Sequence, residues 1–116
     1  MSGWWVVVDP RTPAERDASE EKMAHLVASW EAGVRSMWFL TRDLVKAGKA
    51  TQLSFNGYPN RFTVAAGDLV PLIIDGPPTW KDDHGQEHNG RVTIHRDQLA
   101  ALQAGHVLTV ELWDVT

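Results

Sequence analysis

Residues 23–45 read MAHLVASWEAGVRSMWFLTRDLV, and the periodicity of this stretch decides the predicted fold. Its apolar residues recur at intervals of three and four, which is typical of the buried face of an amphipathic helix. They are Met23, Leu26, Val27, Trp30, Val34, Met37, Trp38, Thr41, Leu44 and Val45. The charged residues fall mostly on the other side. The pattern therefore predicts a long helix that packs Trp30 and Trp38 against a sheet.

The residues on either side of this stretch set the limits of the predicted helix. Thr12 and Pro13 fit an N-cap and a first helical position, and Glu15 completes a capping box. Gly48 fits the position that follows a helix C-terminus. A continuous helix between these limits would be roughly 50 Å long at 1.5 Å per residue, which is too long for a domain of this size. Because Gly33 interrupts the pattern, we expect a kink or two abutting helices there.

The rest of the chain reads mainly as short strands. Aromatic, β-branched and alternating residues predict strands at 4–8, 51–55, 61–64, 91–95 and 107–113. The second and third form a hairpin around the turn residues 56–60. We expect 91–95 to be a core strand and the last strand to be buried on both faces. Residues 68–75 fit either an edge strand or a short helix capped by Asp68, and 95–105 predicts a short helix that stops at Gly105.

Together these elements predict an α+β fold in a single domain that covers residues 1–116. A mainly antiparallel sheet of four to six strands is covered on one face by the long N-terminal helix, straight or kinked, and by the short C-terminal helix. The order of the elements matches a split β-α-β arrangement with an insertion. Such a fold supports many functions, so a function must be argued from individual residues.

Composition removes several classes of function. The net charge of −4 argues against nucleic acid as the main partner, because phosphate neutralisation needs an excess of Lys and Arg. The absence of cysteine excludes disulfide frameworks, thiolate zinc sites and cysteine nucleophiles. The N-terminus lacks the basic region of a signal peptide, and no apolar run approaches the roughly 18 residues that span a membrane. We therefore expect a cytoplasmic protein without a membrane partner.

Residues 76–90, GPPTWKDDHGQEHNG, form the most polar stretch of the chain. A long polar insert on a rigid scaffold is a common place for binding or catalysis. Its candidate binding residues are Trp80, Asp82, Asp83, His84, Glu87 and His88. The spacing of His84 and His88 would bring two metal ligands together on a helix, but Gly85 disfavours a helix and fits a hairpin turn between 79–83 and 86–94. We therefore expect no metal site and no other cofactor.

A second candidate surface is the loop that carries Tyr58 and Arg61, because Tyr and Arg are enriched among interface anchors. The alternative is that Tyr58 packs over its own hairpin. No serine lies in a Gly-x-Ser-x-Gly elbow, which removes the most common nucleophile motif. General acid–base catalysis by the carboxylates and histidines of 76–90 remains open. The balance favours a protein that is not an enzyme.

Two functions from different classes follow. The first is a small soluble protein-binding domain without catalysis, in the manner of an inhibitor, antitoxin or bacterial immunity protein. Its mildly acidic surface would mask a partner protein that is basic. The alternative is a small-molecule-binding protein or enzyme with a site under the 76–90 loop. The sequence leaves the oligomeric state and the identity of the partner open.

Overall fold

Six antiparallel strands form the main sheet of the computed structural model, which describes residues 3–33, 35–54, 58–77, 80–81, 87–88 and 91–114. Their order across the sheet is β3-β4-β8-β1-β2-β7. They are β1 (Gly3–Asp9), β2 (Ala28–Gly33), β3 (Ala50–Ser54), β4 (Asn60–Ala65), β7 (Val92–Ile94) and β8 (Val107–Asp114). Two further strands, β5 (Trp80–Lys81) and β6 (Glu87–His88), pair only with each other among the described residues.

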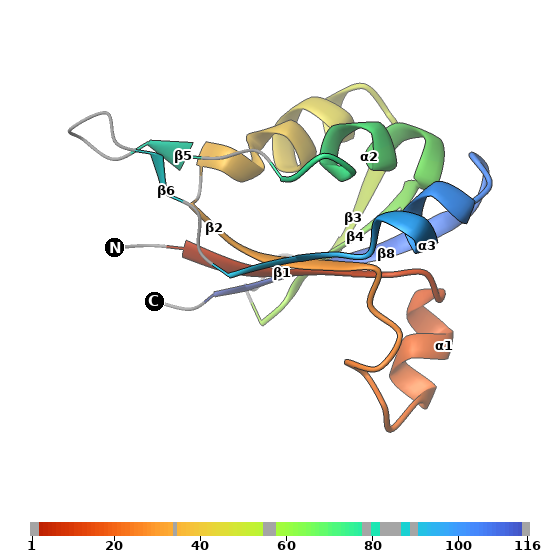
Figure 1. Ribbon diagram of the computed structural model, residues 1–116. Helices are drawn as coiled ribbons and strands as arrows, with labels where there is room; N and C mark the ends of the chain where they lie inside the picture. The colour runs from red at the N-terminus through yellow and green to blue at the C-terminus, as the bar shows by residue number, and fades with distance from the viewer. Residues whose placement is uncertain are drawn as a thin grey trace.

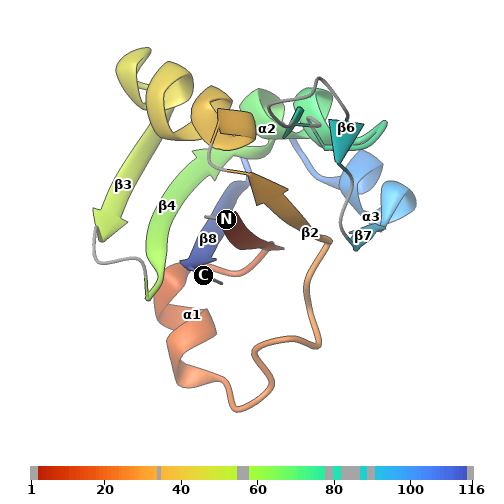
Figure 2. The same cartoon turned by 90° about the vertical axis from the view of Figure 1, so that its left-hand side faces the viewer.

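The helical elements lie on both sides of this sheet (Figure 1). The inner face is covered by the 3₁₀-helix η1 (Arg35–Met37), the π-helix η2 (Phe39–Leu44), α2 (Ala66–Ile73) and α3 (Arg96–Ala101). The outer face is covered in part by α1 (Pro13–Ala18) and the loop that follows it. Figure 2 shows the same loop running from α1 round to β2.

The hydrophobic core fills the space between the inner face and its helices. Val6 in β1 pairs with Trp30 in β2 on one side and with Leu112 in β8 on the other, and all three side chains are fully buried. The helices add Met37, Leu40, Leu69, Ile73 and Leu99. Burial of large apolar side chains is the main favourable contribution to folding, so this layer holds the domain together.

The predicted long helix is wrong. Within 23–45, residues 28–33 form strand β2, and helical structure begins only at Arg35. Trp30 is buried as predicted, but it belongs to a strand that alternates Ala28, Trp30 and Ala32 onto the core. Trp38 is 40% exposed instead of buried. Pairing with β1 and β7 therefore overrides the local helical periodicity, because β2 gains a hydrogen-bonded neighbour on each side.

The N-terminal helix begins where the sequence predicts and ends much earlier. Thr12 accepts a hydrogen bond from the backbone of Glu15, whose side chain accepts one from the Thr12 backbone, so the capping box is confirmed. Only six residues follow before Ser19 caps the C-terminus. This helix lies on the outer face, away from the other helices, which corrects the prediction that all helices share one face (Figure 1).

The remaining predictions divide between confirmed and corrected elements. The α+β class, the mainly antiparallel sheet, the β3–β4 hairpin and the twice-buried last strand are confirmed, and the sheet has six strands, at the upper end of the predicted four to six. Residues 66–73 form the helical alternative, which begins two residues before Asp68 and has Pro71 inside it. Strand β7 lies at an edge instead of in the core. The split β-α-β order is also wrong, because β1 and β2 are antiparallel neighbours.

None of the helices in the described ranges is long and apolar enough to cross a membrane. The Cα radius of gyration is 13.5 Å, close to the value of about 13 Å expected for a compact chain of roughly 100 residues.

Candidate functional site

The outer face of the sheet has two different halves. Helix α1 and its following loop cover the half that carries Asp9, Thr109 and Glu111, and all three side chains are buried there. Beyond this cover, the same face of β1 and β8 carries Trp5 and Trp113, which pair across the two strands. A polar, covered half therefore adjoins an aromatic half that the described helices leave open.

Arg16 fastens α1 to the covered half. Its guanidinium donates one hydrogen bond of 2.8 Å to Asp9 Oδ2 and one of 2.9 Å to Glu111 Oε1. It also donates to the backbone carbonyl of Lys22 in the following loop. Arg16 is the one buried residue of α1, so this helix is held by charged hydrogen bonds and not by an apolar stripe.

Two more arginines extend these contacts into a network of six charged side chains. Arg11 binds both carboxylate oxygens of Asp9. Arg61 donates from Nε and Nη2 to Glu111 Oε2, at 2.9 and 2.6 Å, and from Nη1 and Nη2 to the carboxylate of Asp17. The members are Asp9, Arg11, Arg16, Asp17, Arg61 and Glu111. Three cations face three anions, so the network is neutral.

Arginine pairing decides the ionisation of the buried carboxylates. Burial alone would raise the pKa of Asp9, but hydrogen bonds from Arg11 and Arg16 outweigh it and leave the pKa below its usual value. For Glu111 burial also acts upward on the pKa, and hydrogen bonds from Arg16 and Arg61 again lower it. Both carboxylates are therefore ionised at neutral pH, which suits a structural ion pair and does not suit a general acid.

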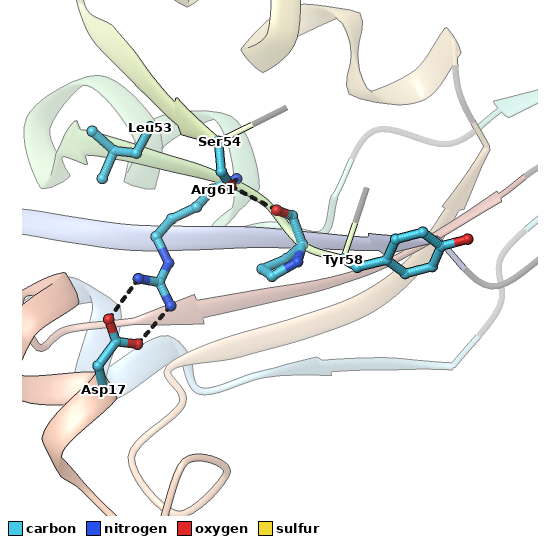
Figure 3. Close-up of a pocket in the computed structure, with 6 residues that line it drawn as sticks. Asp17, Leu53, Ser54, Tyr58 and Arg61 are labelled. Carbon is cyan, nitrogen blue, oxygen red and sulfur yellow. Dashed lines mark hydrogen bonds and ion pairs between the residues drawn. The ribbon is translucent and has the colours of Figure 1, made fainter. Parts of the chain in front are cut away.

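A shallow pocket of about 310 Å³ adjoins this network on the side of β3 and β4. We name it the Arg61 pocket. Its lining residues are Asp17, Leu53, Ser54, Tyr58, Pro59 and Arg61. Figure 3 shows Arg61 reaching from β4 to Asp17 on α1, while the ring of Tyr58 points away from this pair. The Ser54 hydroxyl donates to the Pro59 carbonyl and accepts from the Arg61 backbone, so it is committed to holding the loop.

The open half of the outer face carries a strip of apolar and aromatic side chains, of which three are exposed and Trp5 is half-buried. We name Leu53, Tyr58, Trp113 and Trp5 the outer strip. Leu53 and Tyr58 line the same pocket, and Trp113 lies one residue beyond the pair that Leu112 makes with Asn60, which places it level with Pro59. Tyr58 is 68% exposed and Trp113 37%.

Charged side chains border the far end of the outer strip. The guanidinium carbon of Arg91 lies 5.5 Å from the centre of the Trp5 ring, within the range of a cation–π contact. Arg91 also donates to Glu31, the residue that pairs with Trp5 across β1 and β2. The strip thus runs from an arginine–carboxylate pair at the Arg61 pocket to a second such pair at β2.

The structure places only two of the predicted site residues in this region, Tyr58 and Arg61. For Trp80, Glu87 and His88 it describes the backbone, in which Trp80 pairs with His88 across β5 and β6, one residue away from the register that a two-residue turn at 84–85 would give. The other three, Asp82, Asp83 and His84, lie outside the described residues. The candidate site under the 76–90 loop therefore stays a prediction.

Sequence reasoning missed the buried members of the network. One signal was present: Glu111 is a charged residue between the apolar residues Val110 and Leu112, in the middle of a strand. A carboxylate in that position needs a cationic partner, because a buried unpaired charge is very costly. Its partners Arg16 and Arg61 lie 95 and 50 residues away in sequence, so no local pattern indicates which arginines they are.

Across the described part of the chain, no three His, Asp or Glu residues come together as a possible metal site. Comparisons of the chain with protein-family models, with curated proteins and with solved structures find no match.

Proposed function

We propose that this chain is a protein-binding domain without a catalytic role, and that it docks its partner on the outer strip. The observation that carries the proposal is the exposure of Trp113 and Tyr58 beside Arg61 on one face of a rigid sheet. Trp, Tyr and Arg are the residues most enriched among the hot spots of protein interfaces. A contiguous exposed patch of apolar and aromatic side chains is typical of an interaction site, whereas exposed arginine by itself is ordinary.

The surroundings of the outer strip also fit an interface. A typical interface has an apolar and aromatic centre with a polar rim. Here the Asp17–Arg61 pair lies at one end and the Glu31–Arg91 pair at the other. Arg61 is held by the buried carboxylate of Glu111, so its orientation is set before a partner arrives, which lowers the entropic cost of binding.

An inhibitor or immunity-like role is the form of protein binding that the composition favours. A partner with a basic surface stays a prediction of the net charge of −4. The exposed carboxylates of Glu15, Glu20 and Glu21, on α1 and its loop, support it because they lie on the same side of the sheet as the strip. They would speed the approach of a basic protein, and the aromatic side chains would supply most of the affinity.

The test compares two tryptophans of similar exposure on opposite faces. Trp113 is 37% exposed on the outer face, and Trp38 is 40% exposed on the helical side. Immobilised wild-type protein, Trp113→Ala and Trp38→Ala are used to capture partners from a lysate of the source cells. A protein retained by wild type and Trp38→Ala but lost by Trp113→Ala is then purified and titrated.

For that partner we expect Trp113→Ala to raise the Kd about 30-fold, which corresponds to a hot spot of about 2 kcal/mol. Trp38→Ala should change the Kd less than twofold. Equal binding by both variants would exclude the outer strip as the docking surface, and a loss confined to Trp38→Ala would move the interface to the helical side.

A further inference from the structure

We propose that the Arg61 pocket accepts the carboxylate of an Asp or Glu side chain of the partner, in place of the carboxylate of Asp17. The source of that carboxylate rests on the proposed function, because the pocket opens beside the outer strip. The chemistry rests on the geometry of the pocket alone. Among its six lining residues Arg61 is the one cation, and Ser54 is already committed within the loop.

Arg61 is held in a binding orientation by contacts on its buried side. Its Nε and Nη2 donate to the buried carboxylate of Glu111, which Arg16 and Trp113 also contact. The edge formed by Nη1 and Nη2 is thereby directed at Asp17. An arginine fixed in this way offers two parallel N–H groups, the arrangement that matches a carboxylate.

Asp17 is a replaceable partner of these two N–H groups of Arg61. Its side chain is 57% exposed, and it lies near the end of a helix of six residues. An exposed ion pair contributes little to stability, because water screens the charges and solvates the carboxylate when it leaves. Glu111 differs, since it is buried and must keep its arginines. The outer carboxylate can therefore exchange while the inner one stays.

The walls of the Arg61 pocket are partly apolar. Leu53, Tyr58 and Pro59 make three of the six lining residues, and Leu53 and Tyr58 are exposed to solvent. They provide apolar contact for the methylene groups that precede a side-chain carboxylate. The volume of about 310 Å³ lies at the small end of the range for ligand pockets, which suits one side chain and not a large cofactor.

The experiment uses sodium butyrate as the probe, because it carries one carboxylate on a short apolar chain like that of glutamate. Protein labelled with ¹⁵N is titrated at constant ionic strength, and the Arg61 Nε–H and the backbone amides of Leu53 and Ser54 are followed by NMR. We expect saturable shifts confined to this pocket. Butyramide, which has the same shape without the charge, should give none. Asp17→Asn should bind butyrate about fivefold more tightly, because the internal competitor is weakened.

Three results would overturn the proposal: no saturable shift in Asp17→Asn, equal shifts with butyramide, or an Asp17→Asn affinity no higher than that of wild type. If Asp17→Asn failed to fold, the wild-type titration with its butyramide control would decide the question. The titration needs no partner protein. A butyrate site together with an unchanged Trp113→Ala Kd would therefore uphold the pocket and reject the docking surface, and the reverse pair of results would do the opposite.

Discussion

Replacing Arg16 with methionine should destabilise the protein strongly, because two buried carboxylates depend on it. The substitution keeps most of the length of the side chain and removes the hydrogen bonds to Asp9 and Glu111. Taking one partner from a buried ion pair costs about 3–5 kcal/mol. Asp9 keeps Arg11, and Glu111 keeps Arg61, so we expect about 3 kcal/mol, the lower end of that range.

Urea unfolding at pH 7 measures this loss, with the midpoint and the slope compared between variants. Arg11→Met is the matched control, because Arg11 also binds Asp9 but is less buried than Arg16 and has no hydrogen bond to Glu111 among its contacts with the network. It should lose less than half as much stability as Arg16→Met. Arg16→Lys should fall between the two, since one ammonium group does not reproduce the two-sided fork.

The pH dependence separates lost charge pairing from lost packing. The folded-state pKa of Asp9 and of Glu111 lies below the ordinary values of 3.8 and 4.5. Their stabilising contribution is therefore complete above those values and is lost as the pH falls through the lower, folded pKa. The difference between wild type and Arg16→Met should shrink as the pH falls from 5 towards 2. A difference below 1 kcal/mol at pH 7, or one that stays constant down to pH 2, would refute the electrostatic account.

Four further substitutions test the fold. Trp30→Ala should cost about 4 kcal/mol, because it removes a fully buried aromatic side chain, and Trp38→Ala should cost less than about 1; equal losses in urea unfolding would contradict their different burial. Thr12→Ala should lose about 1 kcal/mol with its capping hydrogen bond, measured by thermal unfolding, and an unchanged Tm would show that α1 does not need its cap. Gly48→Ala should cost about 1 kcal/mol, because Gly48 has a φ of 76°; a stabilised variant would contradict the left-handed conformation.

Local chemistry explains the parts of the fold that the sequence predicts well. The capping box at Thr12 depends on residues three positions apart, and the turn at Gly48 depends on one backbone angle. Strand β8 is buried at five consecutive positions, Leu108 to Leu112, and therefore on both of its faces, as its apolar run predicts. Each of these signals is complete within a few residues, so distant contacts do not change its meaning.

The helix prediction for 23–45 is wrong because the periodicity of a helix and that of a strand coincide in this stretch. Trp30 is at once a member of the three-and-four spacing and the centre of the alternation that Ala28, Trp30 and Ala32 make in β2. The small residues around it carry no strong preference of their own. The sheet decides, since Val6 in β1 pairs with Trp30, and this neighbour is 24 residues away and invisible to a periodicity. The pairing of Trp5 with Trp113 on the outer strip is not predicted for the same reason, because only the register of the strands brings these two residues together.

The outer face is divided into a polar, covered half and an aromatic, open half, and this division favours a binding role. Apolar surface is stabilising when it is buried, at about 25 cal/mol per Å², and α1 is an element that already lies on this face. It nevertheless covers the polar half, where Arg16 must neutralise Asp9 and Glu111, while Trp113 stays 37% exposed and Trp5 is only half-buried. A face shaped by stability alone would place the aromatic side chains under the helix and the charged ones in water. The observed arrangement is the reverse. A partner that covers the outer strip would bury these aromatic side chains and so explain why α1 does not.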